Sequence, residues 1–210
     1  VLARLPETLA ARNPAALAPA VLLDNARHLL RNRQSRFFML LAAVAMVAIV
    51  TIIAGLPRLY EANFGVSGAL FAILFGLHGV GIVVGQVLNH RLIGRIGAVA
   101  SAIIASLIMS VACLAVALLS VTGTAGPYSV SAAMFVFAIG YLIVFSNATA
   151  LTLEPHGAIA GFASSFFGFV AQVVSSAIGT AAVALAGTSI TAWSLLLLAV
   201  SLGCLLALLG

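Results

Sequence analysis

The stretch SNATALTLEPHGAIAGFASSFFG, residues 146–168, joins two apolar segments through a turn of only a few residues. Pro155 and Gly157 mark this turn, because proline and glycine both favour irregular backbone over a continuing helix. Beyond the turn, glycine and serine occupy positions where a lipid-facing helix carries leucine. The stretch therefore predicts two neighbouring helices, the second of which packs closely against another helix and moves against it.

The composition of the whole chain identifies its solvent. Of the 210 residues, 64% are hydrophobic and only 6% are charged. A soluble domain of this size cannot bury so much apolar surface, and the apolar runs reach the ~20 residues that cross a ~30 Å hydrocarbon layer. The composition predicts an all-α membrane protein whose main partner is the lipid bilayer.

Charge and hydropathy divide the chain into two regions. Residues 1–36 form a basic arm, and residues 37–210 form a bundle of six transmembrane helices. The predicted spans are residues 37–56, 68–88, 98–121, 130–153, 158–185 and 190–209. Turn residues such as Pro57, Gly65 and Gly187 separate them.

The second half of the arm is amphipathic. Its apolar residues fall on one helical face: Leu22, Ala26, Leu29 and Leu30. Such a helix lies at a membrane surface, or it serves as a solvated connector. Nucleic-acid binding is not expected, because no aromatic residues alternate with the arginines.

The arginines predict the orientation of the bundle. Eight of the nine basic residues lie in the arm or in the turn after the second span, whereas Arg58 alone lies on the other side. Cytoplasmic segments carry the excess of arginine. Both ends of the chain, and the turn at residues 154–157, are therefore predicted to be cytoplasmic.

His78 is the one titratable residue near the middle of a span. It shares a helical face with Gly81, Gly85 and Asn89, so it points into protein or into a water-filled cavity. A neutral histidine bonded to a neighbouring helix is one interpretation, and a proton or polar relay is the other. The central parts of the spans contain no Asp, Glu, Lys or Arg, so this chain shows no obvious proton carrier.

A stripe of small and polar residues runs along the helix that follows the turn. It consists of Gly157, Gly161, Ser165, Gly168, Gln172, Ser175 and Gly179. Helix packing explains the stripe, although Gln172 is large and polar enough to contact a solute. The polar residues of the preceding span either form interhelical hydrogen bonds or line a cavity, because an amide without a hydrogen-bond partner in hydrocarbon is costly. Its polar residues are Tyr141, Ser146 and Asn147.

Enzymatic function is not expected. The chain has no arrangement of serine, cysteine, histidine or carboxylate that suggests catalysis, no histidine spacing for a metal, and no cofactor motif. Cys113 and Cys204 lie in the middle of different spans and are predicted to be small buried hydrophobic residues.

Five short motifs carry a family resemblance. They are LPETL at 5–9, AGLP at 54–57, NFGVS at 63–67, NHRLIGRIGA at 89–98 and the stretch at 146–168. With these motifs in this order, the chain resembles the C-terminal half of a major facilitator superfamily transporter, and most closely a Bcr/CflA-type drug exporter.

The resemblance implies that the spans are helices seven to twelve of a twelve-helix transporter in the bacterial inner membrane. Residues 1–36 would be its central cytoplasmic loop, and the missing N-terminal half its partner. The implied activity is efflux of drugs or small metabolites in exchange for protons, at a midplane site between the halves.

The resemblance also assigns roles to single residues. The cavity-lining positions are Thr51 on the first span, Tyr141, Ser146 and Asn147 on the fourth, and Gln172 is added from the stripe. A conformational loop is matched by Asn89, Arg91, Arg95 and Gly97, for which membrane topology alone is the other explanation.

Two alternatives to drug export stay open. One is a transporter of the same superfamily for another solute class, such as sugars or amino acids. The other is a non-transporting membrane subunit whose glycine-rich helices serve assembly.

Overall fold

The computed structural model describes residues 18–210, so the LPETL motif and the arginines at positions 4 and 12 lie outside the described part. The elements are α1 (Pro19–Arg31), α2 (Arg33–Phe64), α3 (Gly68–Ile96), α4 (Ala98–Val121), α5 (Pro127–Leu153), the 3-10 turn η1 (Glu154–Ile159), α6 (Ala160–Ala186) and α7 (Ile190–Leu209).

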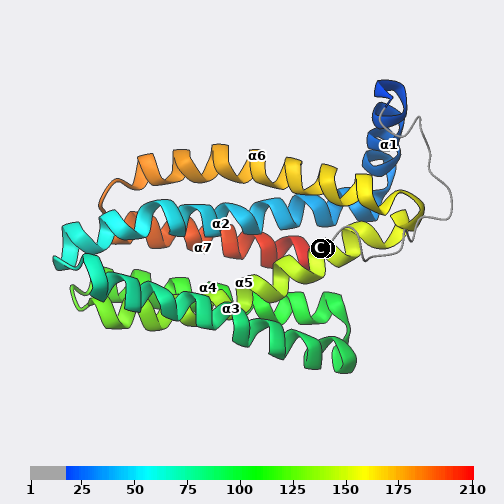
Figure 1. The fold of residues 1–210 in the computed structure, drawn as a ribbon. Coiled ribbons are helices and arrows are strands. Elements are labelled where there is room, and N and C mark those ends of the chain that lie inside the picture. The colour runs from blue at the N-terminus through cyan, green and yellow to red at the C-terminus, as the bar shows by residue number, and fades with distance from the viewer. Residues whose placement is uncertain (1–17) are drawn as a thin grey trace, which may run out of the picture.

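The helices α2 to α7 run side by side in alternating directions (Figure 1). Each has 20 to 32 residues, which is long enough to cross a membrane. By length and composition there are five candidate membrane segments, because α5, η1 and α6 run on as one stretch of 60 residues that turns back at η1. The predicted all-helical membrane fold is confirmed.

Two segments predicted as turns are helical. α2 continues through Pro57 to Phe64 and ends at Gly65, whose φ of +63° is left-handed. A proline removes one helical hydrogen bond, which a helix tolerates where water or another group reaches the freed carbonyl. α3 likewise continues from Asn89 to Ile96 and ends at Gly97 with φ +80°. The apolar pattern marks where lipid ends, whereas backbone hydrogen bonds decide where the helix ends.

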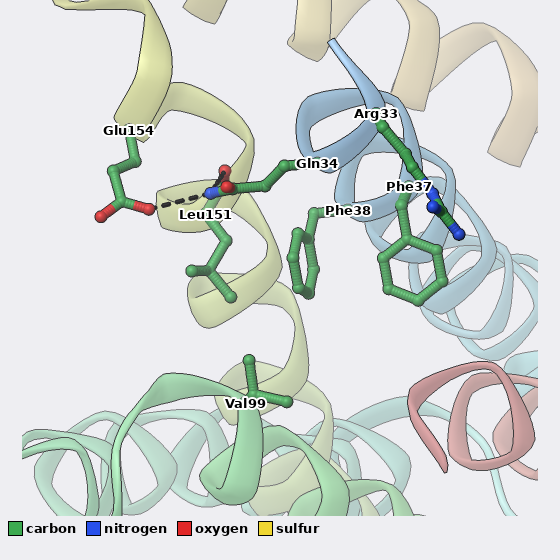
Figure 2. Close-up of a pocket in the computed structure, with 7 residues that line it drawn as sticks. All are labelled: Arg33, Gln34, Phe37, Phe38, Val99, Leu151 and Glu154. Atoms are coloured by element: carbon green, nitrogen blue, oxygen red, sulfur yellow. Dashed lines mark hydrogen bonds between the residues drawn. The ribbon is translucent and has the colours of Figure 1, made fainter. Parts of the chain in front are cut away.

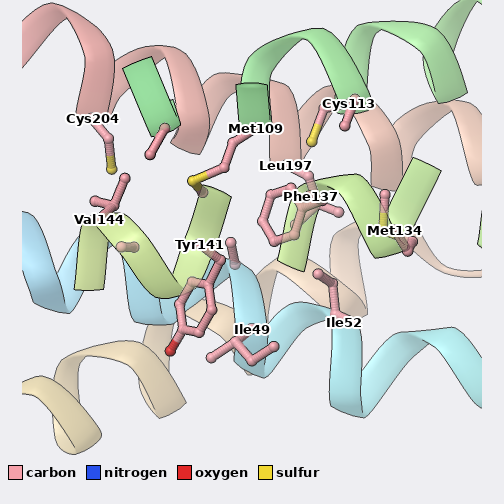
Figure 3. Packing of buried hydrophobic residues seen from close by; sticks show 14 of the residues in the cluster. Ile49, Ile52, Met109, Cys113, Met134, Phe137, Tyr141, Val144, Leu197 and Cys204 are labelled. Carbon is pink, nitrogen blue, oxygen red and sulfur yellow. The ribbon is translucent and has the colours of Figure 1, made fainter. Parts of the chain in front are cut away.

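The core forms around α5, which contacts α2, α3 and α4, while α4 packs on α7 and α2 packs on α6. Figure 3 shows Phe137 of α5 among Met109, Leu197 and other apolar side chains. Cys113 and Cys204 are buried free thiols, as predicted.

α1 lies across one end of the bundle, which we call the arm end (Figure 1). Leu29 is fully buried there, and Leu22 and Ala26 are half-buried. α1 contacts α2 and α6, and Asn32 separates it from α2 by capping the Ser35 amide at 3.0 Å. The arm end also holds η1, the end of α3 and the end of α7.

Candidate functional site

The stripe on α6 is covered at one end and open at the other. Ser175 and Gly179 are buried, and a Cβ on Gly179 would lie 2.8 Å from Val50 of α2. By contrast Gly161 and Gly168 are exposed, and a Cβ on either would meet nothing within 4 Å. Among the described residues no helix covers the arm-end part of the stripe, so close packing there stays a prediction.

The geometry of helix packing explains why the stripe divides. Five of the six buried residues of α6 recur at every fourth position, namely Ala163, Phe167, Ala171, Ser175 and Gly179, and the sixth, Ala186, ends the helix. A row at steps of four is inclined to the helix axis, whereas the stripe runs nearly parallel to it. The two rows meet only at Ser175 and Gly179. Towards the arm end they diverge, and Gly161, Ser165, Gly168 and Gln172 are left open.

An aromatic row on α5 lies beside this helix. Phe137, Tyr141 and Phe145 stack at centroid distances of 6.5 and 5.8 Å, and Phe145 lies 6.2 Å from Phe167 of α6. Tyr141 is 6% exposed, and Figure 3 shows its hydroxyl pointing away from Phe137 and Met109. Spacing at every fourth residue could have revealed Phe137 and Phe145, but the contact with Phe167 needs the fold.

Gln172 and Ser146 keep some exposure. Gln172 is exposed and donates to Ser176 Oγ at 2.9 Å on the same helix, which leaves its carbonyl oxygen available to a solute. Ser146 is half-buried near the arm end of α5. These two residues are the expected cavity residues that retain access to the surface, whereas Tyr141 is buried beside them.

Thr51 is buried inside the bundle, contrary to its expected place on a cavity. It is 1% exposed, and its hydroxyl donates to the Val47 carbonyl one turn earlier at 2.8 Å. Its own carbonyl accepts a bond of 3.4 Å from Trp193 Nε1 of α7. The place of a residue along its span predicts its depth in the membrane, whereas the rotation of the helix about its own axis decides which side chain reaches the cavity.

The predicted face of α3 packs directly on α5. The His78 ring lies 3.2 Å from the Met134 carbonyl, and Gly81 and Gly85 let the backbone of α5 approach. His78 is 4% exposed and stacks on Phe75, while its Nε2 has no partner among the described residues. The arrangement agrees with the interpretation of a histidine bonded to a neighbouring helix.

Asn147 lies at this same contact between α3 and α5, which we call the seam, and not on an open cavity. Its Nδ2 donates to Asn89 Oδ1 of α3 at 2.9 Å, and the two side chains are 0% and 2% exposed. From the sequence, Asn147 was expected on the cavity and Asn89 in the conformational loop. In the structure these two residues contact each other. The bond gives the Asn147 Nδ2 and the Asn89 Oδ1 the partners that buried amides require, while the Asn147 Oδ1 has no partner among the described residues.

The predicted conformational loop is the helical end of α3. Arg91 and Arg95 are exposed on its last two turns, and Gly97 ends the helix. Arginines near a helix C-terminus interact favourably with its exposed carbonyl groups. The placement suits either a latch or membrane topology, because both need arginines at the arm end.

A histidine cluster joins α1 to η1 at the arm end. The His156 Nε2 and the Ser35 hydroxyl of α2 share a hydrogen bond of 2.8 Å, and the His28 ring of α1 meets the His156 ring edge to face at 5.5 Å. His156 is 2% exposed, and its Nδ1 has no partner among the described residues. No sequence pattern indicated this contact, because the three residues come from separate elements.

Acidification is expected to undock α1. Burial first, and then the charge of His28, hold the pKa of His156 below its ordinary value of 6.5. The docked state therefore disfavours protonated His156, so docking is complete above pH 6.5 and is lost as the pH falls through the lower docked-state pKa. Amide hydrogen exchange of residues 22–31, corrected for intrinsic pH dependence, should rise over this interval. His156→Gln should remove the pH step, and a step that persists in that variant contradicts the assignment.

No group of three or more histidine, cysteine, aspartate or glutamate residues within 18–210 could hold a metal ion.

Comparison with known proteins agrees with this architecture. Residues 1–180 match the Major Facilitator Superfamily. The chain is also similar to the uncharacterized MFS-type transporter YdgK of Bacillus subtilis (strain 168), with 28% identity over 127 residues. That match covers 59% of this chain and 31% of the relative, so it spans about a third of the relative's length. The family match, together with the apolar helices of membrane length, shows that this multi-pass membrane chain belongs to the Major Facilitator Superfamily.

Proposed function

We propose that the chain is the C-terminal six-helix half of a proton-coupled exporter of drugs or small amphiphilic metabolites, of the Bcr/CflA type. The family and the relative named as a transporter support membrane transport. The five motifs support the exporter type and the C-terminal half. Six arginines of the described residues lie at the arm end, which supports a cytoplasmic arm end in the bacterial inner membrane.

The open part of the α6 stripe is the observation that carries this proposal. Gly161, Ser165 and Gly168 leave a surface of small residues that another helix can approach closely, and no described helix covers it. The N-terminal six-helix half of the same transporter is the partner that fits this surface. A hinge at Pro155 and Gly157 would then let α6 move relative to that half.

The proposed substrate site lies where this surface meets the aromatic row. Tyr141 is adjacent to Gly140, the central residue of α5, and Gln172 is adjacent to Val173, the central residue of α6. Both therefore lie near the membrane midplane, where transporters of this architecture bind substrate between their halves. Aromatic rings with a few polar groups suit amphiphilic molecules. We place the proton-carrying group in the other half, because no carboxylate lies in the central part of the described spans.

Drug tolerance of a pump-deficient bacterium that expresses the complete protein tests this function. The wild type should raise tolerance, and Tyr141→Ala or Gln172→Ala should each cut the transport rate about tenfold, which corresponds to one lost polar or aromatic contact. Thr180→Ala is the matched control, since Thr180 is exposed on another face of α6. A wild type that confers no tolerance but accumulates sugars or amino acids would favour the other solute class. Absence of any transport would favour an assembly subunit.

A further inference from the structure

A groove opens at the arm end between the start of α2, the start of α4 and the end of α5. Its volume is about 620 Å³, and its lining consists of Arg33, Gln34, Phe37, Phe38, Val99, Leu151 and Glu154 (Figure 2). A second groove of about 240 Å³ continues between α2 and α7, past Leu40, Val44 and Cys204. Phe37 lines both grooves, so the two grooves are adjacent, one at the end of the bundle and the other towards the hydrocarbon level, and we call them together the path.

Opposite charges stand on the two sides of the first groove. Figure 2 shows Arg33 and Glu154 at its two sides, with Phe38 between them. Gln34 Nε2 donates to Glu154 Oε2 at 2.9 Å and to the Leu151 carbonyl at 3.0 Å, which fixes the carboxylate at the groove. This bond uses Oε2, and the other carboxylate oxygen can accept from a ligand.

The groove lies at the depth of lipid headgroups. α2 has 32 residues and is therefore ~48 Å long at ~1.5 Å per residue, which exceeds the ~30 Å hydrocarbon core. Arg33 is the first residue of α2, and Glu154 directly follows α5. Their side chains thus belong to the headgroup region, whereas Leu40 and Val44, which are 51% and 37% exposed, belong to the acyl-chain region.

We propose that this path binds a phospholipid with a primary ammonium headgroup, of the phosphatidylethanolamine type, from the leaflet at the arm end. Arg33 binds the phosphate, for which a guanidinium is well suited, and Glu154 accepts hydrogen bonds from the ammonium. One acyl chain passes Phe37 and lies between α2 and α7. A glycerol headgroup offers Glu154 no positive charge, and a choline headgroup offers it no N–H donor.

Lipid retention by the complete protein tests this site without any transport measurement. The purified protein is equilibrated with equal amounts of phosphatidylethanolamine, phosphatidylcholine and phosphatidylglycerol of the same acyl chains, and bound lipid is counted by native mass spectrometry. The wild type should retain phosphatidylethanolamine about tenfold over the other two, as expected for one charge-assisted contact. Equal retention of the three lipids overturns the proposal.

Single substitutions test which residue binds the phosphate and which binds the ammonium of the headgroup. Glu154→Gln should remove the preference over phosphatidylglycerol, and Arg33→Gln should lower retention of all three phospholipids. Glu61→Gln and Arg58→Gln are the matched controls, because both residues are exposed near the opposite end of α2. A loss in these controls equal to that in the arm-end variants contradicts the site. Unchanged melting temperatures of all four variants would show that the losses are local.

A crosslinking experiment needs only the wild type. Phosphatidylethanolamine with a photoreactive acyl chain should label peptides of α2 and α7 that contain Phe37 or Cys204. Excess phosphatidylethanolamine should compete, whereas free phosphoethanolamine should not, since the acyl chain supplies part of the binding. Labelling spread evenly over all lipid-facing helices, or competition by free phosphoethanolamine alone, overturns the lipid assignment.

Discussion

Replacing Gly85 by valine is expected to separate α3 from α5 and to destabilise the bundle strongly. A Cβ at this position would lie 2.7 Å from the Ile139 carbonyl oxygen and 3.0 Å from its Cα. Both atoms belong to the backbone, so no side-chain rotation relieves the clash. The cost of overpacking at such a contact is about 3 kcal/mol. At roughly 2–4 °C per kcal/mol for a chain of this size, the apparent melting temperature should fall by roughly 10 °C.

Gly76→Val is the matched control on the same helix. Gly76 is exposed, lies on the opposite face of α3, and a Cβ there would meet nothing within 4 Å. Both substitutions change helix propensity equally, so the difference between them isolates the contact with α5. Thermal unfolding of the complete protein in detergent provides the measurement. Equal melting temperatures for the two variants would show that α3 does not pack on α5 through this face.

The buried face of α3 was predicted from the sequence, but the helix that it contacts was not. Spacing placed His78, Gly81, Gly85 and Asn89 on one side of a helix and predicted that this side meets protein or a water-filled cavity, and in the structure it meets protein. Spacing does not say which helix is met, because small residues allow close approach to any neighbour. The identity of α5 as that neighbour, and of Asn147 as the partner of Asn89, required the fold.

Residues of the candidate site were harder to predict for a related reason. Tyr141 and Gln172 were found as polar groups in apolar spans, and Gln172 is exposed whereas Tyr141 is buried in the aromatic row of α5. Thr51 was expected on the cavity only because of its place along the first span. The orientation of α2 about its axis places Thr51 inside the bundle, bonded to its own helix and to Trp193. Contacts between separate elements, such as that of His28 with His156, leave no periodic signal to detect.

Asn147→Leu is expected to destabilise the bundle by about 2 kcal/mol, because it leaves the amide of Asn89 buried without a partner. Asn89→Leu should cost a similar amount for the reciprocal reason. The double variant should cost less than the sum of the two, since replacing both partners removes the unpaired group together with the bond. The expected coupling is about 1 kcal/mol, at the level measured for hydrogen bonds between membrane helices.

The same variants decide between the seam and a substrate site for Asn147. Thr149→Val is the control, because the Thr149 hydroxyl donates to the Phe145 carbonyl of its own helix at 2.7 Å and joins no second helix. Its free energy of unfolding should stay within about 0.5 kcal/mol of the wild-type value. If the losses of unfolding free energy add in the double variant, the Asn89–Asn147 hydrogen bond does not exist. If Asn147→Leu abolished transport and left stability unchanged, Asn147 would belong to the substrate cavity. A substitution impairs transport without affecting the fold when the replaced group contacts the solute.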